Sequence, residues 1–155
     1  METISFRVKM GGPETTDEIV AHLKANGFAC VDERINQKNF PLIPKEVQDE
    51  DEIVIYDPEA GFTEKEGLAI LNREGLIRPT YEHALRFAWK HGTATISAEK
   101  PLVIFLHKPW QGADRFGLGR ILYVKLNPSD RKLRVNSPGL RFNDYCVLAG
   151  VNPGR

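Results

Sequence analysis

A histidine, a lysine and a tryptophan directly follow the most apolar run of the chain, Leu102–Leu106. A histidine at the end of a buried strand is held rigidly beside a loop, a setting typical of general acids and bases. This makes His107 a candidate catalytic residue, with Lys108 to meet an anion and Trp110 to stack on a base or sugar ring. We favour the alternative, that Pro109 and Trp110 only close the edge of a buried strand.

Basic and aromatic residues are interleaved after this junction. The stretch holds Arg120, Lys125, Arg131, Lys132, Arg134 and Arg141 among Phe116, Tyr123 and Phe142. A sheet face of this composition suits single-stranded nucleic acid, because basic groups hold phosphates while aromatic rings stack on bases. In the expected strand at residues 120–126, alternation places Ile121, Tyr123 and Lys125 on one face. Leu122, Val124 and Leu126 lie on the other face. The candidate binding residues are Lys108, Trp110, Arg115, Arg120, Tyr123, Lys125, Arg131 and Lys132.

The charges are unevenly distributed along a chain whose formal net charge is zero. Residues 101–155 carry nine Lys and Arg against three Asp and Glu, whereas residues 1–100 carry twelve against eighteen. This asymmetry indicates either a basic surface for an anionic partner or two parts of one fold that attract each other. We favour the second, because a pI of about 6.9 lies well below that of typical nucleic-acid modules.

Other patterns that could carry chemistry each lack an essential part. Gly112, Gly117 and Gly119 share a loop without the lysine and helix of a phosphate-binding motif. His91 and Thr93 supply one half of the paired H-x-T arrangement of two-histidine phosphoesterases, and no second pair occurs. The four histidines and two cysteines have no metal-ligand spacing, so we expect neither a metal nor a cofactor.

Two further groups of residues favour a structural interpretation. The acidic run at residues 49–52 lacks the alternating ligands and central glycine of a calcium loop, and is expected to be a solvated charge run. Cys30 and Cys146 lie in apolar contexts and are expected to be core thiols.

The elements that must position these residues can be outlined from patterning and caps. Capping boxes predict helices that begin after Thr15 and Thr63, and apolar spacing predicts a third at residues 81–91, although Gly67 weakens the second by about 1 kcal/mol. Strands are expected at residues 4–9, 28–33, 52–58, 102–107, 120–126, 132–135 and 144–150. We predict one α+β domain over residues 1–155, with three helices and a mostly antiparallel C-terminal sheet.

The second and third expected helices raise one sharper alternative. A helix, a short turn containing glycine and another helix could form a DNA-binding helix-turn-helix. The first of the two is rich in glutamate, however, and the turn at residues 75–79 is too long. Glu82 and Arg86 are spaced as an exposed i,i+4 ion pair instead.

The segments EGLIRPTYEHALRFAWKHG, PLVIFLH and RFNDYCVLAG together resemble a pattern in small uncharacterised bacterial and phage-type proteins. In those proteins a Gly-Leu-Arg-Pro-x-Thr string opens a helix, and an apolar strand follows. The similarity covers residues 74–150, with Ile77 as an extra residue that departs from the pattern. The resemblance implies an α+β layout and a bacterial or phage-like origin, and it carries no known activity.

We therefore expect a cytoplasmic protein, because the N-terminus lacks an apolar signal segment and the longest apolar run is far too short for a membrane helix. Its predicted function is binding, through the basic C-terminal sheet and residues 107–120. The partner would be a protein or an anionic ligand, single-stranded nucleic acid included. One alternative is a small hydrolase or transferase acting on a nucleotide or phosphodiester through His107, with Arg115 or Arg120 holding the phosphate. Another is a structural subunit of an oligomer.

Overall fold

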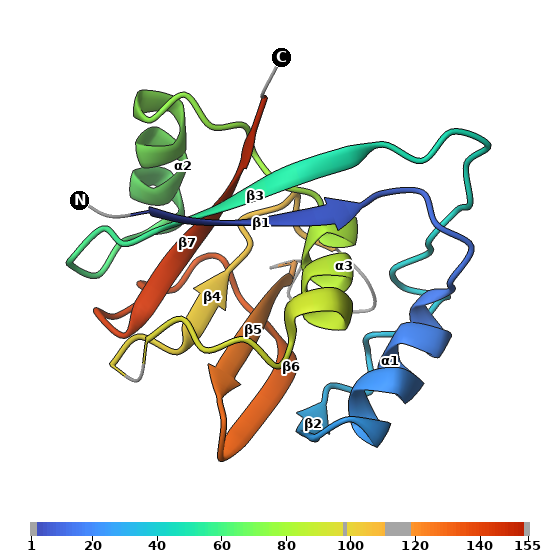
Figure 1. Ribbon diagram of the computed structural model, residues 1–155. Helices are drawn as coiled ribbons and strands as arrows, with labels where there is room; N and C mark the ends of the chain where they lie inside the picture. Colours follow the sequence, from blue (N-terminus) through green and yellow to red (C-terminus); the bar gives the residue numbers. More distant parts are fainter. Residues whose placement is uncertain (1–2, 98, 111–118, 154–155) are drawn as a thin grey trace.

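A seven-stranded mixed sheet organises the computed structural model, which describes residues 3–97, 99–110 and 119–153 (Figure 1). The strands are β1 (Thr3–Lys9), β2 (Phe28–Val31), β3 (Glu50–Tyr56), β4 (Leu102–Ile104), β5 (Ile121–Asn127), β6 (Asp130–Asn136) and β7 (Cys146–Asn152). Their order is β1-β3-β7-β4-β5-β6-β2, and neighbours are antiparallel except β4 with β7 and β2 with β6. This architecture confirms the predicted α+β class and the mostly antiparallel sheet.

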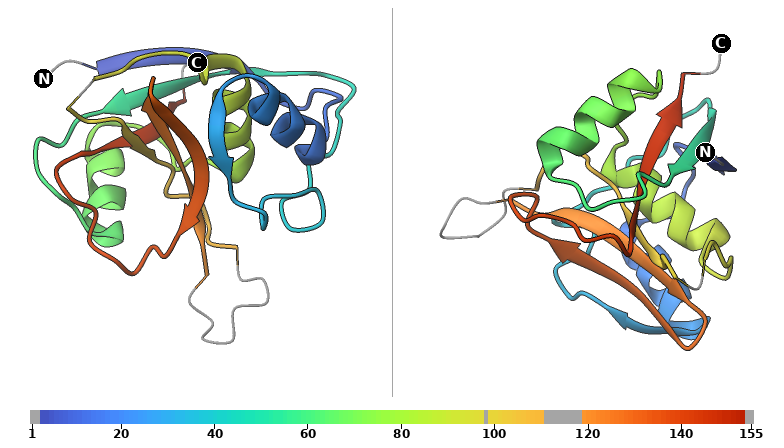
Figure 2. Two further views of the ribbon diagram at one scale, coloured as in Figure 1. Left: turned by 90° about the horizontal axis from the view of Figure 1, so that it is seen from below. Right: turned by 90° about the vertical axis from the view of Figure 1, so that its left-hand side faces the viewer.

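Three helices cover the sheet, as predicted, and they lie on both of its faces (Figure 2). They are α1 (Thr16–Ala25), α2 (Glu64–Arg73) and α3 (Tyr81–His91). The capping boxes at Thr15 and Thr63 both form, with each hydroxyl accepting a backbone N–H from the glutamate three residues later. Apolar residues of α1 and α3 join the larger core cluster, whereas those of α2 join the smaller one.

The placement of α2 and α3 in different core clusters also decides the helix-turn-helix alternative. In such a motif the two helices pack on each other so that the second can enter a DNA groove. Here α2 packs with Ile104 and Leu148, and α3 packs with Phe105 and Val124. The sheet therefore separates the two helices, and they do not form that motif.

Alternation along β5 divides its side chains between the two cores, as the sequence predicts. Leu122, Val124 and Leu126 are buried in the larger cluster beneath α1 and α3. Ile121 is buried in the smaller cluster, and Tyr123 packs against the edge of that cluster. Tyr123 and the residues in line with it therefore lie on the α2 side of the sheet.

Gly67 lies where α2 packs closely on the sheet. This close packing explains why a glycine, which has low helix propensity, occupies the middle of the helix. A Cβ atom at this position would lie 2.5 Å from Cδ1 of Leu106 and 3.2 Å from Cδ2 of Phe62. Both neighbours are buried, at 0% and 1% exposure, so neither can move aside freely.

We expect Gly67→Ala to lower the free energy of unfolding by about 1 kcal/mol or more, because overpacking outweighs the gain in helix propensity. Urea denaturation followed by circular dichroism measures this change. The exposed neighbour Ala69 provides a matched control on the same helix. Ala69→Gly should lose stability from propensity alone, and a more stable Gly67→Ala variant would contradict the packing account.

Arg86 is buried, although its spacing from Glu82 predicted an exposed ion pair. Its Nη1 donates to Glu14 at 2.6 Å, its Nη2 donates to the carbonyl of Gly12 at 3.1 Å, and its Nε lies 3.4 Å from Glu82. Glu82 also accepts the backbone N–H of Gly11 at 2.8 Å. Because these partners belong to α3 and to the connection between β1 and α1, the network fixes that connection against the helix.

None of the helices in the described part of the chain has the length and apolar character that a membrane-spanning helix needs.

Candidate functional site

Part of the sheet face on the α2 side is left uncovered, and it carries basic and aromatic side chains. α2 packs near β4 and β7, so the far ends of β5 and β6 extend beyond it (Figure 2). Cross-strand pairing sets Tyr123 opposite Arg134 and Lys125 opposite Lys132. Directly paired residues point to the same face of a sheet. A tyrosine and three cations therefore share this uncovered surface, which we call the open sheet face.

The hairpin between β5 and β6 sets this register. Asn127 pairs with Asp130 across the turn, and the Asn127 side chain accepts the backbone N–H of Ser129 at 3.1 Å. This turn fixes which residues of β5 and β6 lie opposite each other along the rest of the two strands. Asp130 also lies between the two lysines, at 2.8 Å from Nζ of Lys125 and 3.5 Å from Nζ of Lys132. It thus reduces the repulsion between two like charges that face each other.

A hollow of about 510 Å³ lies on the open sheet face. Its lining residues are Glu99, Pro101, Leu102, Tyr123, Lys125, Lys132, Arg134 and Tyr145. Tyr145 is 59% exposed, which is unusual for a tyrosine, and it comes from the connection that leads into β7. The hollow therefore combines two phenol rings, apolar stems and three cationic heads.

The electrostatics of the open sheet face favour an anionic ligand. Partial burial raises the pKa of Tyr123, although Arg134 and Lys125 pull it downward, so the phenol stays neutral near pH 7. The hydrogen bond from Lys125 lowers the pKa of Asp130 and keeps that carboxylate charged. Arg134 forms no hydrogen bond or ion pair with another described residue. Asp130 thus faces Lys125 and Lys132, and Glu99 also lines the hollow. Arg134 is exposed, and its charge contributes to a lowered pKa of Asp32.

Few charge–charge contacts between described residues connect the acidic part of the chain to the basic part. Among the described residues, one ion pair joins residues 1–100 to residues 101–155, from Arg141 to Glu66 at 2.9 Å. Both of its side chains are more than half exposed, so water screens the pair. The interpretation favoured from the sequence, that the two parts attract each other, therefore depends on few contacts.

His107 is enclosed by backbone groups. Its side chain is 1% exposed, its Nδ1 lies 2.7 Å from the carbonyl of Lys108, and its Nε2 accepts the backbone N–H of Leu122 at 2.9 Å. These partners require a neutral ring with its proton on Nδ1. Burial and, less strongly, the nearby guanidinium of Arg78 lower the pKa of His107 to about 4, although the hydrogen bond to the carbonyl of Lys108 acts in the opposite direction. The imidazole thus stabilises the backbone where β4 ends and has no free nitrogen for a substrate.

This geometry also explains why β4 is shorter than the predicted strand at residues 102–107. Phe105 still donates its backbone N–H to Leu122 at 3.2 Å. Beyond that point the His107 side chain replaces a backbone carbonyl as the partner of β5. The apolar run stays buried after regular pairing has ended.

The remaining predicted site residues that the structure describes do not gather at the open sheet face. Trp110 packs against the larger core, with its ring 5.3 Å from that of Phe40. Arg131 points away from Lys132 and donates to the carbonyls of Thr93 and Ala94.

Lys108 and Arg120 also lie elsewhere. Lys108 is exposed in the segment that follows β4. Arg120 pairs through its backbone with Trp110. Arg115 lies outside the described residues.

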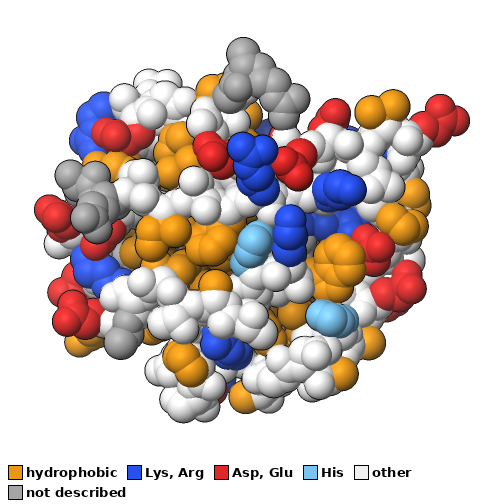
Figure 3. Space-filling model, in the orientation of Figure 1, with side chains coloured by type: hydrophobic (Ala, Val, Ile, Leu, Met, Phe, Trp, Pro, Cys, Tyr) orange, Lys and Arg blue, Asp and Glu red, His pale blue; other side chains and the backbone are white. Residues whose placement is uncertain are grey.

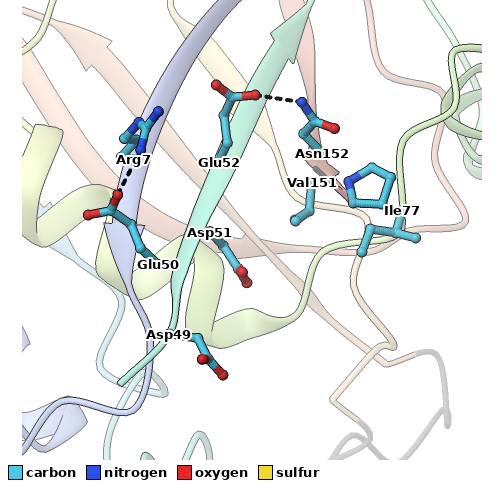
Figure 4. Close-up of a pocket in the computed structure, with 9 residues that line it drawn as sticks. Arg7, Asp49, Glu50, Asp51, Glu52, Ile77, Val151 and Asn152 are labelled. Atoms are coloured by element: carbon cyan, nitrogen blue, oxygen red, sulfur yellow. Dashed lines mark hydrogen bonds and ion pairs between the residues drawn. The ribbon is translucent and has the colours of Figure 1, made fainter. Parts of the chain in front are cut away.

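The acidic run forms part of a hollow of about 590 Å³ beside β1, β3 and β7 (Figure 4). Glu50 pairs with Arg7 at 2.9 Å, Glu52 accepts from Asn152 at 2.7 Å, and Asp51 accepts from His83 at 2.8 Å. The acidic run is therefore a set of contacts that join β3 to β1, β7 and α3, as well as a solvated surface.

No group of three or more His, Cys, Asp and Glu side chains within the described ranges is arranged to hold a metal ion. Cys146 is buried, as predicted for a core thiol, and burial raises its pKa to about 11. Cys30 is only half-buried and lies opposite Lys132 in the pairing of β2 with β6.

Arg134 and Tyr145 complete the open sheet face, although neither was among the predicted site residues. Arg134 could have been found from the sequence, because period-2 alternation puts it on the face of Lys132 and opposite that of Arg131. Tyr145 carries no such signal, because it belongs to an irregular connection and reaches the hollow through the tertiary fold.

No protein-family model, no curated protein and no solved structure matches the chain. The resemblance of residues 74–150 to small bacterial and phage-type proteins stays a prediction.

Proposed function

We propose that this protein binds single-stranded nucleic acid on the open sheet face. The observation that carries the proposal is the paired arrangement of Tyr123 with Arg134 and of Lys125 with Lys132 on a face that no helix covers. Phosphates need cations, bases need flat rings to stack on, and this face offers both within one hollow.

Each group has a distinct role in the proposed complex. Lys132 and Arg134 stand two residues apart on β6, roughly 7 Å along the strand, and contact successive parts of the nucleic-acid backbone. The rings of Tyr123 and Tyr145 stack on unpaired bases. Because neither ring offers a pattern of base-edge hydrogen bonds, we expect weak sequence preference and strong salt dependence.

Charge reversal at Lys132 and Arg134 tests this proposal. We expect Lys132→Glu with Arg134→Glu to lower the affinity for a fluorescein-labelled oligothymidylate by about tenfold or more at low salt. The slope of log K against log salt should shrink by about 1.4, since two phosphate contacts are lost and each contributes about 0.7 on a single strand. Fluorescence anisotropy over a salt series measures both quantities.

A matched control distinguishes the effect of losing these two contacts from the effect of a lower net charge. Lys24→Glu with Lys38→Glu changes the charge by the same amount at two exposed lysines outside the hollow. This control should keep most of the affinity, and Tyr123→Phe should bind better than Tyr123→Ala because only the phenylalanine keeps a stacking ring. Equal losses in the two double variants would show that the open sheet face is not the binding surface.

The hydrolase or transferase alternative gains no support from His107, because both ring nitrogens bind backbone groups. The oligomer alternative stays a prediction.

A further inference from the structure

A second hollow lies on the other side of the sheet, between the end of β1, α1 and α3. Its volume is about 470 Å³, and its lining residues are Lys9, His22, Arg86, Trp89 and Lys90. We call it the α1–α3 groove. Figure 3 views this side of the molecule and shows basic and histidine side chains gathered around hydrophobic ones over α3. A smaller hollow that shares His22, Trp89 and Lys90 continues the groove toward the end of α3.

Trp89 forms an aromatic wall of this groove. The positions of Arg86, Trp89 and Lys90 on α3 bring their side chains to one face of the helix. Trp89 is half-buried against the larger core, with the Arg86 guanidinium 5.9 Å from its ring centre and the His22 ring 6.2 Å away in an edge-on arrangement. These contacts hold the indole in place, so a ligand ring would meet a wall that is already ordered.

Lys9 and Lys90 give the groove its free positive charge. Neither forms a hydrogen bond or ion pair through its side chain with another described residue. Arg86 is already neutralised by Glu14 and Glu82. Glu50 lies opposite Lys9 in the pairing of β1 with β3, and its carboxylate pairs with Arg7. The pKa of Glu50 is lowered by Arg7 and, less strongly, by both lysines. None of the described residues that line the groove is acidic.

We propose that the α1–α3 groove binds a small molecule in which a planar aromatic ring is joined to an anionic group. The ring would lie along Trp89, and the anion would meet Lys9 and Lys90. Nucleoside monophosphates and aromatic carboxylates share this chemistry. The proposal is independent of the open sheet face, because the two hollows have no lining residue in common and lie on opposite sides of the sheet.

Nuclear magnetic resonance can follow the indole N–H of Trp89, which a Trp110→Phe variant assigns because the chain has two tryptophans. The probes are adenosine 5′-monophosphate against adenosine, and indole-3-acetate against indole-3-ethanol. We expect at least one anion to shift the Trp89 signal with Kd below about 1 mM and to bind about fivefold more tightly than its neutral counterpart. The pair with the larger contrast identifies the ligand source.

Substitutions of the two lysines test whether they bind the anionic group of the ligand. Lys9→Gln with Lys90→Gln should weaken the anion to the level of its neutral counterpart, while Lys24→Gln, at an exposed lysine of α1 outside the groove, should leave it unchanged. Both substitutions are on the surface, so the fold is expected to persist and is checked by the same spectra. The proposal is overturned if neither anion shifts Trp89 at about 1 mM, if both neutral compounds bind as well as the anions, or if the double variant binds normally.

Discussion

Replacing Arg86 by alanine is expected to lower the free energy of unfolding by about 3 kcal/mol, among the largest effects of any single substitution here. The side chain is 2% exposed, and its guanidinium binds two carboxylates and a carbonyl. Alanine would leave Glu14 and Glu82 beside a cavity with their charges uncompensated. It would also weaken the attachment of the β1–α1 connection to α3, because Gly12 and Glu14 would lose their partner and the bond from Gly11 to Glu82 would remain.

Two further variants distinguish the contributions of the charge, the shape and the burial of Arg86 to stability. Arg86→Lys keeps the charge but cannot reproduce three contacts with one ammonium group, so it should also be clearly destabilised. Arg141→Ala removes an arginine that also pairs with a glutamate and a carbonyl, yet is 59% exposed, and it should cost far less. Urea denaturation of all three proteins measures the differences. Equal losses for Arg86→Ala and Arg141→Ala would contradict the burial argument.

His107 is expected to make folding sensitive to pH in the acid range. Its pKa is about 4 in the folded chain and about 6.5 in an unfolded one. Between these values the unfolded state binds a proton that the folded state does not, so stability rises with pH and falls as the solution is acidified. Between about pH 7.5 and about pH 4.5 this residue should remove about 2.5 kcal/mol, at 1.36 kcal/mol for each pKa unit.

His107→Gln isolates this effect, because a glutamine oxygen can still accept the N–H of Leu122 but does not titrate. The stability difference between the wild type and this variant should shift by about 2.5 kcal/mol in favour of the variant over that range. The other titratable groups are the same in both proteins, so their contributions cancel in this difference. If the stability difference between the two proteins does not change with pH, His107 has the same pKa in the folded and unfolded states, and the argument is contradicted.

The local elements were predictable from the sequence because their signals are local. Thr15 and Thr63 mark helix starts through bonds to glutamates three residues later, and those bonds form. Strand alternation in β5 correctly separated Leu122 from Tyr123. Each of these features needs only neighbours within a few residues.

Features that depend on residues far away in the sequence could not be predicted from local sequence patterns. The i,i+4 spacing of Glu82 and Arg86 predicted an exposed pair, because nothing near them shows that the connection after β1 covers the helix. The end of β4 was predicted too late, because His107 meets Leu122 fifteen residues further along the chain.

The candidate site was predictable in part. Tyr123, Lys125 and Lys132 were identified from composition and alternation, and they lie together. Arg131 was grouped with Lys132 on charge although adjacent residues of a strand face opposite sides. Tyr145 reaches the hollow from a connection whose path depends on the whole sheet.

Ultraviolet crosslinking of the protein to an oligothymidylate, followed by mass spectrometry of the joined peptides, tests the proposed function most directly. If the open sheet face binds single-stranded nucleic acid, the crosslinks fall on the peptides that hold Tyr123 and Tyr145, and they disappear with Lys132→Glu and Arg134→Glu. Crosslinks that map instead to α1 and α3, or an oligonucleotide that is not captured even at low salt, would contradict the assignment.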